Sequence, residues 1–321
     1  MNYRTLGKTG LSVSQIGFGA SPLGDVFGKA DPSEATRAVH RAIDVGINLF
    51  DVSPYYGHTL AEERLGKALT GRREKVLLAT KCGRYGAESF DFSATRIRRS
   101  IDESLTRLQT DYVDLFLAHD IEFGNVEQII SETVPALREI QQSGKARYIG
   151  VTGYPLQMLK SVAERERIDV ILSYCRYNLL VTDLDADLAP SAKSRKIGLI
   201  NASPLHMGLL SGSPIPTWHP APASVRRAAA DIIDFCRKHK LDPAVLALRF
   251  CIEHPYVAST LVGMSTREQV ESNLKALTFE IEPALLHQIQ EIAAPAKDIV
   301  WPSGSPENQD QTGTHPPQKF R

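Results

Sequence analysis

Residues 76–119 read VLLATKCGRYGAESFDFSATRIRRSIDESLTRLQTDYVDLFLAH, with two short apolar runs on either side of a longer polar stretch. The runs Val76–Lys81 and Val113–His119 are short and mostly apolar, which is typical of buried strands. Between them, Ser93–Leu108 repeats apolar residues at three- and four-residue spacing, which indicates an amphipathic helix. The stretch therefore predicts a strand, a helix and a second strand parallel to the first.

The same alternation recurs along the rest of the chain. We expect further strands at Gln15–Gly19, Ile47–Asp51, Ala146–Val151, Val170–Tyr174, Gly198–Ala202 and Val257–Val262. We expect further helices at Ser33–Val45, Ala61–Leu69, Val126–Ser143, Leu156–Glu166, Leu184–Arg195, Val225–His239 and Arg267–Leu277. About eight such units in roughly 260 residues are what a closed barrel requires, whereas an open doubly wound sheet more often has fewer units and a glycine-rich first turn. The sequence thus predicts an α/β fold, a (β/α)8 TIM barrel.

Two segments lie outside this repeat. Tyr3–Leu6 and Leu11–Val13 flank the turn-forming tetrapeptide Gly7–Gly10, which predicts a β-hairpin before the first barrel strand. From Pro295 the chain is rich in Pro, Gly, Ser and Gln, so we expect a C-terminal tail, residues 295–321, that is partly mobile. No linker interrupts the chain, and residues 1–294 are therefore expected to form one barrel domain.

Charge and composition exclude several classes of function. The 37 Lys and Arg residues balance the 37 Asp and Glu residues, so no general positive field favours a nucleic-acid partner. No apolar run approaches the roughly 20 residues that span a bilayer, and Met1–Thr5 lacks the apolar segment of a secretory signal. We expect a cytoplasmic protein with no membrane partner; its oligomeric state, monomer or homodimer, is left open.

The cysteines and histidines give no metal-binding pattern. The four cysteines form no CxxC pair, so we expect reduced thiols; they are Cys82, Cys175, Cys236 and Cys251. His206 and His219 could bind a metal, but no HxH or HExxH motif occurs. We therefore expect no metal site.

The carboxyl ends of the predicted strands carry four residues of complementary chemistry. Active sites of such barrels lie at those ends, so Asp51, Lys81 and His119 should meet at one rim, with Tyr56 five positions after Asp51. Asp51 can hold Lys81 charged, and Lys81 should lower the pKa of Tyr56 below its ordinary value of about 10. Tyr56 could then exchange a proton with an alcohol or a carbonyl, while His119 hydrogen-bonds the same oxygen. Each residue alone could be an ion pair or a packing residue, but their convergence favours catalysis.

This arrangement resembles the Asp-Tyr-Lys-His tetrad of the aldo-keto reductases. Supporting motifs occur in the order of that family, at Gly17–Gly19, Asn48–Asp51, Tyr55–Gly57, Gly144–Val151, Tyr177–Leu180 and Ser203–Leu205. The resemblance covers about residues 3–294. It implies a nicotinamide cofactor lying across the barrel mouth without a Rossmann domain, and hydride transfer at a substrate carbon.

The resemblance also implies a set of cofactor contacts. Loops after the seventh and eighth barrel strands often hold phosphates, which points to Ser203, Leu205, Gly208, Gly263, Ser265 and Thr266. Ser265 and Thr266 open a predicted helix whose N-terminal amides attract anions, although a plain N-cap is the alternative. Further contacts are implied for Gly19, Thr152, Tyr174, Gln269 and Asn273.

Departures from the family pattern bear on the choice of cofactor. Many members carry basic residues in the last loop that grip the 2′-phosphate of NADP, but the corresponding Gly263 and Gln269 are neutral. The resemblance therefore implies NAD, with NADP less favoured. The usual Ser-Asn after the fifth strand is replaced by Thr152-Gly153, and the usual Gln on the sixth strand by Tyr174, which could supply aromatic stacking.

Several departures are similar to one branch of the family, the plant-type L-galactose dehydrogenases. They are His119–Gly124, Thr152–Gly153, Leu172–Cys175, Met207–Leu210 and Trp301–Gly304. This implies oxidation at C1 of an aldose, such as L-galactose or L-fucose, to the aldonolactone. Asp120 and Trp301 are candidate substrate contacts, because a carboxylate suits sugar hydroxyls and an indole suits a pyranose face. The alternatives are an ordinary loop carboxylate and a tail anchored by its own tryptophan.

Three other functions fit part of the sequence. A general aldehyde or ketone reductase would use the same tetrad. A non-catalytic barrel could bind the cofactor as a sensor, which the intact tetrad disfavours. A metal-dependent barrel hydrolase is disfavoured by the missing histidine pairs.

Overall fold

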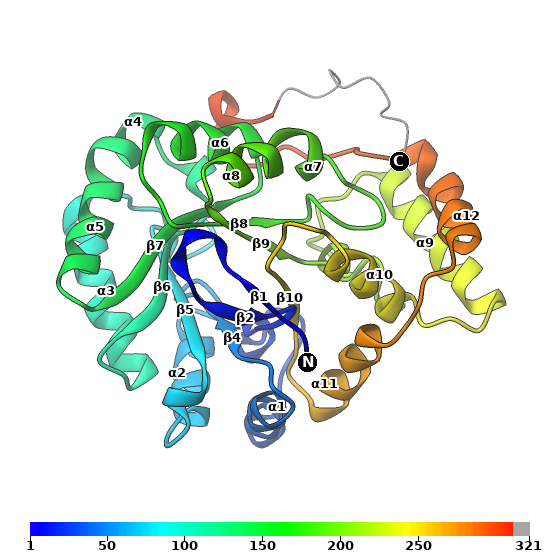
Figure 1. Ribbon diagram of the computed structural model, residues 1–321, viewed down its shortest axis with the longest axis horizontal. Helices are drawn as coiled ribbons and strands as arrows, with labels where there is room; N and C mark the ends of the chain where they lie inside the picture. The colour runs from blue at the N-terminus through cyan, green and yellow to red at the C-terminus, as the bar shows by residue number, and fades with distance from the viewer. Residues whose placement is uncertain (311–321) are drawn as a thin grey trace.

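The computed structural model describes residues 1–310, in which eight parallel strands close into a barrel surrounded by helices (Figure 1). The predicted (β/α)8 fold is confirmed. The strands are β3 (Ile16–Gly19), β4 (Leu49–Asp51), β5 (Leu77–Cys82), β6 (Val113–Ala118), β7 (Ala146–Gly153), β8 (Val170–Tyr174), β9 (Gly198–Ala202) and β10 (Ser259–Gly263). β10 pairs in parallel with β3, for example Val262 with Phe18, and this pairing closes the barrel.

The helices lie outside the strands, as Figure 1 shows. They are α1 (Pro32–Asp44), α2 (Leu60–Ala68), α3 (Ala94–Leu108), α4 (Val126–Gln128), α5 (Val134–Gln142), α6 (Leu156–Arg165), α7 (Leu184–Asp187), α8 (Ala189–Ser194), α9 (Ala223–Lys238), α10 (Pro243–Ile252), α11 (Arg267–Leu274) and α12 (Pro283–Ala293). Among residues 1–310, none of these helices combines the length and the apolar character that a membrane crossing requires.

The barrel strands are apolar on both faces because each face packs against other side chains. One buried cluster collects the residues that alternate along the strands and fill the inside of the barrel, including Leu49, Ala79, Leu115, Leu117, Val170, Leu172, Ile200 and Leu261. A larger cluster packs the other strand face against the helices. The four cysteines are buried and form no disulfide; Cys82 and Cys251 lie in the larger cluster, and Cys175 and Cys236 in a third cluster.

The predicted hairpin is present as β1 (Tyr3–Thr5) and β2 (Ser12–Ser14), which pair antiparallel. Leu6, between the two strands, is fully buried in the interior cluster with Leu11 and Val13. A side chain at Gly198, the first residue of β9, would collide with Leu6 at 2.6 Å. The hairpin therefore covers the amino end of the barrel, opposite the strand ends where catalysis is expected.

Two predicted helices are interrupted at prolines. The segment predicted as Val126–Ser143 forms α4, a π turn at Ile129–Thr133 and then α5, in which Pro135 is the second residue. Proline has no N–H for the regular hydrogen bond to the residue four positions back, and a wider turn accommodates that loss. Pro190 similarly lies at the start of α8, where the segment predicted as Leu184–Arg195 divides.

Two helices escaped prediction. α10 is apolar except for Arg249, with Val245, Leu246, Ala247 and Leu248 all buried, so it shows little helical periodicity. Its N-terminal signals were nevertheless present, since Asp242 caps the helix and Pro243 occupies its first position. α12 likewise begins at a proline, Pro283. The expected mobility of the tail concerns in large part residues 311–321, which lie outside the described residues.

Candidate active site

The strand alternation brings the four predicted catalytic residues to one end of the barrel. Asp51 and Lys81 lie two positions after the interior residues Leu49 and Ala79, and so point to the same side of their strands. His119 follows β6 in the same way after Leu117. The carboxyl ends of β4, β5 and β6 meet at the barrel mouth, and the loop after β4 brings Tyr56 to the same place.

Lys81 is the centre of the hydrogen bonding in this group. Its buried ammonium lies 2.5 Å from Asp51 Oδ1, 2.8 Å from the carbonyl of Val52 and 3.3 Å from the hydroxyl of Tyr56. Burial, the largest single effect, lowers the pKa of Lys81, but the charges and hydrogen bonds of Asp51 and Tyr56 together outweigh it and the net pKa is raised. Lys81 is therefore held charged against the hydroxyl of Tyr56.

The expected depression of the Tyr56 pKa is wrong for this structure. Burial raises the pKa of Tyr56 to about 12, with Lys81 acting in the opposite direction and Asp51 and Asp120 adding to the rise. The phenolate loses more by leaving water than it gains from an ammonium whose charge is shared with Asp51. At neutral pH the residue is a phenol, able to donate a proton and needing to lose one before it can act as a base.

His119 is buried between two polar neighbours. Its Nδ1 lies 2.9 Å from the hydroxyl oxygen of Ser53, and its Nε2 lies 3.6 Å from Asp120 Oδ2. Burial, together with the positive charges of Lys81 and Arg84, lowers the pKa of His119 well below its usual value. The imidazole is therefore neutral and carries one proton.

Asp120 is buried beside His119 and is paired with an arginine that the sequence did not single out. Arg84 donates to Asp120 Oδ2 at 2.5 Å, and its guanidinium stacks 3.8 Å over the ring of Tyr55. Asp120 Oδ1 is buried and has no hydrogen-bond partner within residues 1–310. Asp120 is thus not an ordinary exposed loop carboxylate, and its free oxygen adjoins the catalytic group.

A second buried carboxyl group, Glu122, supports the same loop. Its Oε1 accepts from the backbone N–H of Tyr154 and from the hydroxyl of Ser303, both at 3.1 Å. Burial, followed by repulsion from Asp120, raises the pKa of Glu122 to about 8. A side chain at Gly153 would approach Glu122 Oε2 to 2.6 Å, so the glycine makes room for this carboxyl group.

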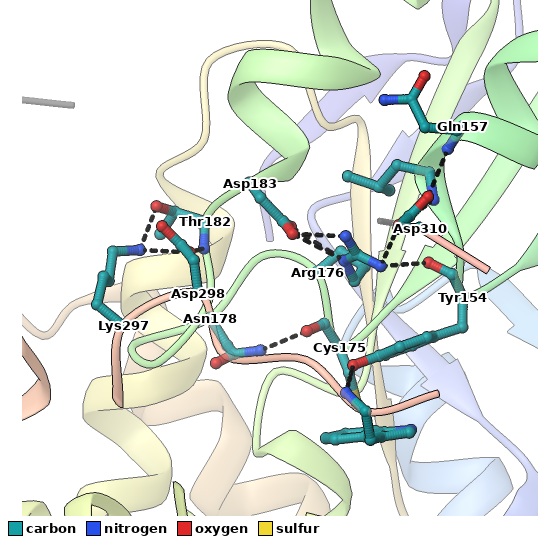
Figure 2. Close-up of polar contacts among 12 residues, drawn as sticks. Tyr154, Gln157, Cys175, Arg176, Asn178, Thr182, Asp183, Lys297, Asp298 and Asp310 are labelled. Carbon is teal, nitrogen blue, oxygen red and sulfur yellow. Dashed lines mark hydrogen bonds and ion pairs between the residues drawn. The ribbon is translucent and has the colours of Figure 1, made fainter. Parts of the chain in front are cut away.

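The described part of the tail, residues 295–310, closes one side of the mouth. Trp301 is 7% exposed and stacks on Tyr154 with ring centres 4.8 Å apart, which fits the alternative of a tail anchored by its tryptophan. Asp310 accepts hydrogen bonds from the N–H groups of Leu156 and Gln157 and lies 2.7 Å from Arg176 (Figure 2). The tail therefore caps α6, which has no side-chain cap of its own at Pro155.

The predicted cofactor residues lie around the same mouth, and two of them, Tyr174 and Leu205, pack against the cluster that contains Trp301. Thr152, Tyr174, Gly263 and Gly19 lie at the carboxyl ends of β7, β8, β10 and β3, and Ser203, Leu205 and Gly208 lie in the loop after β9. A side chain at Gly263 would lie 3.0 Å from Pro22, so the glycine lets the end of β10 pack closely against the segment after β3. This surface of glycines, hydroxyls and an aromatic ring fits a nicotinamide dinucleotide.

The start of α11 is already capped by side chains of the protein. Thr266 and Gln269 form a capping box, and Gln269 also accepts from the N–H of Ser265 at 2.7 Å. The N–H of Arg267 donates to the carboxylate of Glu34 at 2.8 Å. In this structure Thr266 therefore acts as the N-cap of α11, which was the alternative to a phosphate contact. Asn273, the last predicted contact, is buried within α11.

Ser53, Arg84 and Glu122 were missed by the sequence reasoning, although a positional signal was available. Each follows a predicted catalytic residue by two or three positions, in the first turn of a loop after a strand. Such loops build the sites of these barrels, so any polar residue there is a candidate.

Within residues 1–310, no group of three or more histidine, cysteine or acidic side chains could hold a metal ion.

Comparison with known proteins gives a consistent result. Residues 15–294 match the aldo/keto reductase family. The chain is 48% identical over 315 residues to L-galactose dehydrogenase of Arabidopsis thaliana, covering 95% of this chain and 98% of that protein. It is 32% identical over 245 residues to D-arabinose 1-dehydrogenase of Saccharomyces cerevisiae, covering 72% of each. An aldo-keto reductase of Bacillus halodurans, solved in its holo form, superimposes with a TM-score of 0.78 at 30% identity, covering 94% of this chain and 98% of that one.

Proposed function

The chain belongs to the aldo/keto reductase family, and from that starting point we propose that it oxidises an aldose at C1 to the aldonolactone with NAD. The expected substrate is L-galactose or a sugar of related stereochemistry such as L-fucose. The observation that carries the proposal is the contact of Lys81 with both Asp51 and Tyr56 beside His119, in a chain 48% identical to a plant L-galactose dehydrogenase.

In this reaction Tyr56 takes the proton of the C1 hydroxyl. Lys81, held by Asp51, stabilises the negative charge that the phenol oxygen must carry to act as a base. His119 hydrogen-bonds the C1 oxygen and keeps it beside Tyr56. When bound, the nicotinamide supplies the acceptor for the hydride that leaves C1, so the sugar loses two electrons and two hydrogens in total.

NAD is the proposed cofactor because the first turn of α11 carries a negative charge. The additional 2′-phosphate of NADP would need a positive charge there. Gly263 and Gln269 are neutral, and Glu34 places a carboxylate on the first turn of α11. The side chain of Arg267 points toward Glu271, with 3.9 Å between the charged atoms. Hydrogen bonds from Arg267 N–H and Arg37 hold the pKa of Glu34 below its ordinary value, so this carboxylate is ionised.

Asp120 is the proposed contact for a sugar hydroxyl, since its Oδ1 is buried next to His119 and has no hydrogen-bond partner among residues 1–310. Trp301 is proposed to border the sugar with the 7% of its surface that stays exposed beside Tyr154, His206 and His219. The stacking role of Tyr174 stays a proposal of the same kind; its ring packs against Tyr154 at 5.4 Å.

A general aldehyde or ketone reductase is the second candidate. It is favoured by one observation: a Tyr56 hydroxyl with a pKa of about 12 is protonated at neutral pH and suits proton donation to a carbonyl oxygen. The same residues can serve both oxidation of an alcohol and reduction of a carbonyl group. The choice between the two candidate functions therefore depends on which substrate binds at the barrel mouth.

A coupled absorbance assay separates the two functions. The protein is mixed with NAD or NADP and a panel of D- and L-aldoses, and formation of the reduced nicotinamide is followed. We expect reduction of NAD with L-galactose or a stereochemical relative, and its loss in Tyr56→Phe. Tyr112→Phe, which precedes β6 at the opposite end of the barrel, is the matched control and should retain activity. Failure of every aldose, with reduction of simple aldehydes instead, would establish the second candidate.

Assembly and location are proposed from the sequence alone. We expect a monomer or homodimer in the cytoplasm, and light scattering and cell fractionation test the two statements separately.

A further inference from the structure

Ser53 lies inside the catalytic group but has no role in the chemistry described above. It is completely buried in the loop between Asp51 and Tyr56. Its hydroxyl oxygen lies 2.9 Å from His119 Nδ1 and accepts a hydrogen bond from the backbone N–H of Tyr55 at 3.1 Å. The serine thus connects the backbone that carries Tyr56 to the ring of His119.

The hydrogen-bond inventory of the Ser53 hydroxyl determines which way its proton points. A hydroxyl has one proton to donate and lone pairs to accept with. Because the N–H of Tyr55 already uses a lone pair of Ser53, the serine proton is available for an acceptor. Within residues 1–310, His119 Nδ1 is the one acceptor that this hydroxyl reaches. Ser53 keeps a second lone pair that could accept from an Nδ1–H, but the buried serine proton would then have no acceptor among residues 1–310. Leaving a buried donor unsatisfied is costly, so the favoured arrangement has Nδ1 unprotonated.

The other side of the ring gives the same answer independently. His119 Nε2 faces Asp120 Oδ2 at 3.6 Å. A lone pair on Nε2 would face the lone pairs of the carboxyl group, whereas an N–H there is attracted to them. A neutral imidazole has a single N–H, so both contacts require it to be on Nε2.

We infer that Ser53 is a positioning residue that holds neutral His119 in the tautomer with its proton on Nε2. The distance of 3.6 Å to Asp120 is too long for a full hydrogen bond, so this N–H is free to donate to another oxygen in the mouth. If the proposed function holds, on which this step rests, that oxygen is the one on C1 of the sugar. His119 then stabilises the charge that develops there as Tyr56 removes the proton, and it cannot itself be the base.

Nitrogen-15 NMR of histidine-labelled protein tests the tautomer without any substrate. The signals of His119 are identified by their loss in His119→Gln. In the wild type we expect a protonated-type shift for Nε2 and an unprotonated-type shift for Nδ1. In Ser53→Ala we expect intermediate shifts from a mixture of tautomers, and in Ser53→Thr, which keeps the hydroxyl, we expect the wild-type pattern. A proton on Nδ1 in the wild type, or an unchanged pattern in Ser53→Ala, would overturn the inference.

Kinetics test the consequence. One neutral hydrogen bond corresponds to a loss of roughly threefold to tenfold, so we expect kcat of Ser53→Ala to fall by about that factor and Ser53→Thr to restore it. Ser259→Ala is the matched control, since Ser259 is a buried serine at the first residue of β10. If Ser53→Ala fails to fold, the wild-type and Ser53→Thr spectra still decide the tautomer. A correct tautomer in a protein that oxidises no aldose would refute the proposed function and leave this inference standing.

Discussion

Replacing Glu122 by glutamine should remove a pH dependence of stability that originates at the barrel mouth. Burial, and then the repulsion from Asp120, raises the pKa of the Glu122 carboxyl from 4.5 to about 8 in the folded protein. Between these two values the folded state keeps a proton that the unfolded state has lost. The free energy of unfolding therefore falls as pH rises through this window, and the contribution of Glu122 is fully present only below pH 4.5.

The size of the effect follows from the same two values. Each pKa unit corresponds to about 1.4 kcal/mol, so the rise to about 8 is worth roughly 5 kcal/mol at most. Glutamine has the shape of the protonated acid and can still accept from Tyr154 N–H and Ser303. Glu122→Gln should consequently match the wild type in acid and become more stable than it above pH 8, by up to that amount.

Urea unfolding followed by circular dichroism, at about pH 5, 7 and 9, measures both free energies. Ser303→Ala is the control, because it removes a neutral donor to Oε1 and keeps the titrating carboxyl group. Its stability should still fall with pH as in the wild type. Parallel pH profiles for the wild type and Glu122→Gln would refute the reasoning that Glu122 is protonated in the folded state.

Three further predictions concern the reaction, the cofactor and the tail. Because Tyr56 has a pKa of about 12, kcat/KM for sugar oxidation should rise by up to about tenfold per pH unit through the alkaline range, and a plateau near neutrality would contradict the assignment. Glu34→Gln should raise kcat/KM with NADP relative to NAD by about threefold or more, because it removes a carboxylate from the first turn of α11; an unchanged ratio of the two values would contradict the role of Glu34. Asp310→Ala should lower the free energy of unfolding by roughly 1–2 kcal/mol through loss of the α6 cap, measured by urea unfolding with Gln309→Ala as control. Equal stability of the two variants would show that the cap contributes nothing.

The barrel could be predicted because each strand–helix unit carries its own local pattern. α10 could not be found in this way, since a helix that is apolar over most of its surface, with Leu246 and Ala247 both at 0% exposure, has little periodic contrast. The π turn before α5 shows the same limit, because periodicity does not reveal how a chain accommodates Pro135.

The positions of the four candidate catalytic residues were predictable from the rule that strand ends meet, but their ionisation was not. The sign of the Tyr56 pKa shift depends on how completely water is excluded, and sequence spacing contains no information about burial. The partners of His119 and Asp120 raise a related difficulty. Ser53 and Arg84 are adjacent in space to residues 66 and 36 positions away in the chain, so only the folded structure pairs them.

The cap on α6 also sets an order of events during synthesis. Leu156 and the Asp310 that caps it are separated by 154 positions, so the ribosome delivers the helix long before its partner. A nascent chain interrupted between β10 and Trp301 would possess every barrel strand and all of Asp51, Tyr56, Lys81 and His119. It would lack the indole that covers Tyr154, the hydroxyl that meets Glu122 and the carboxylate that meets Arg176. Completion of the mouth thus waits until residue 310 has been translated.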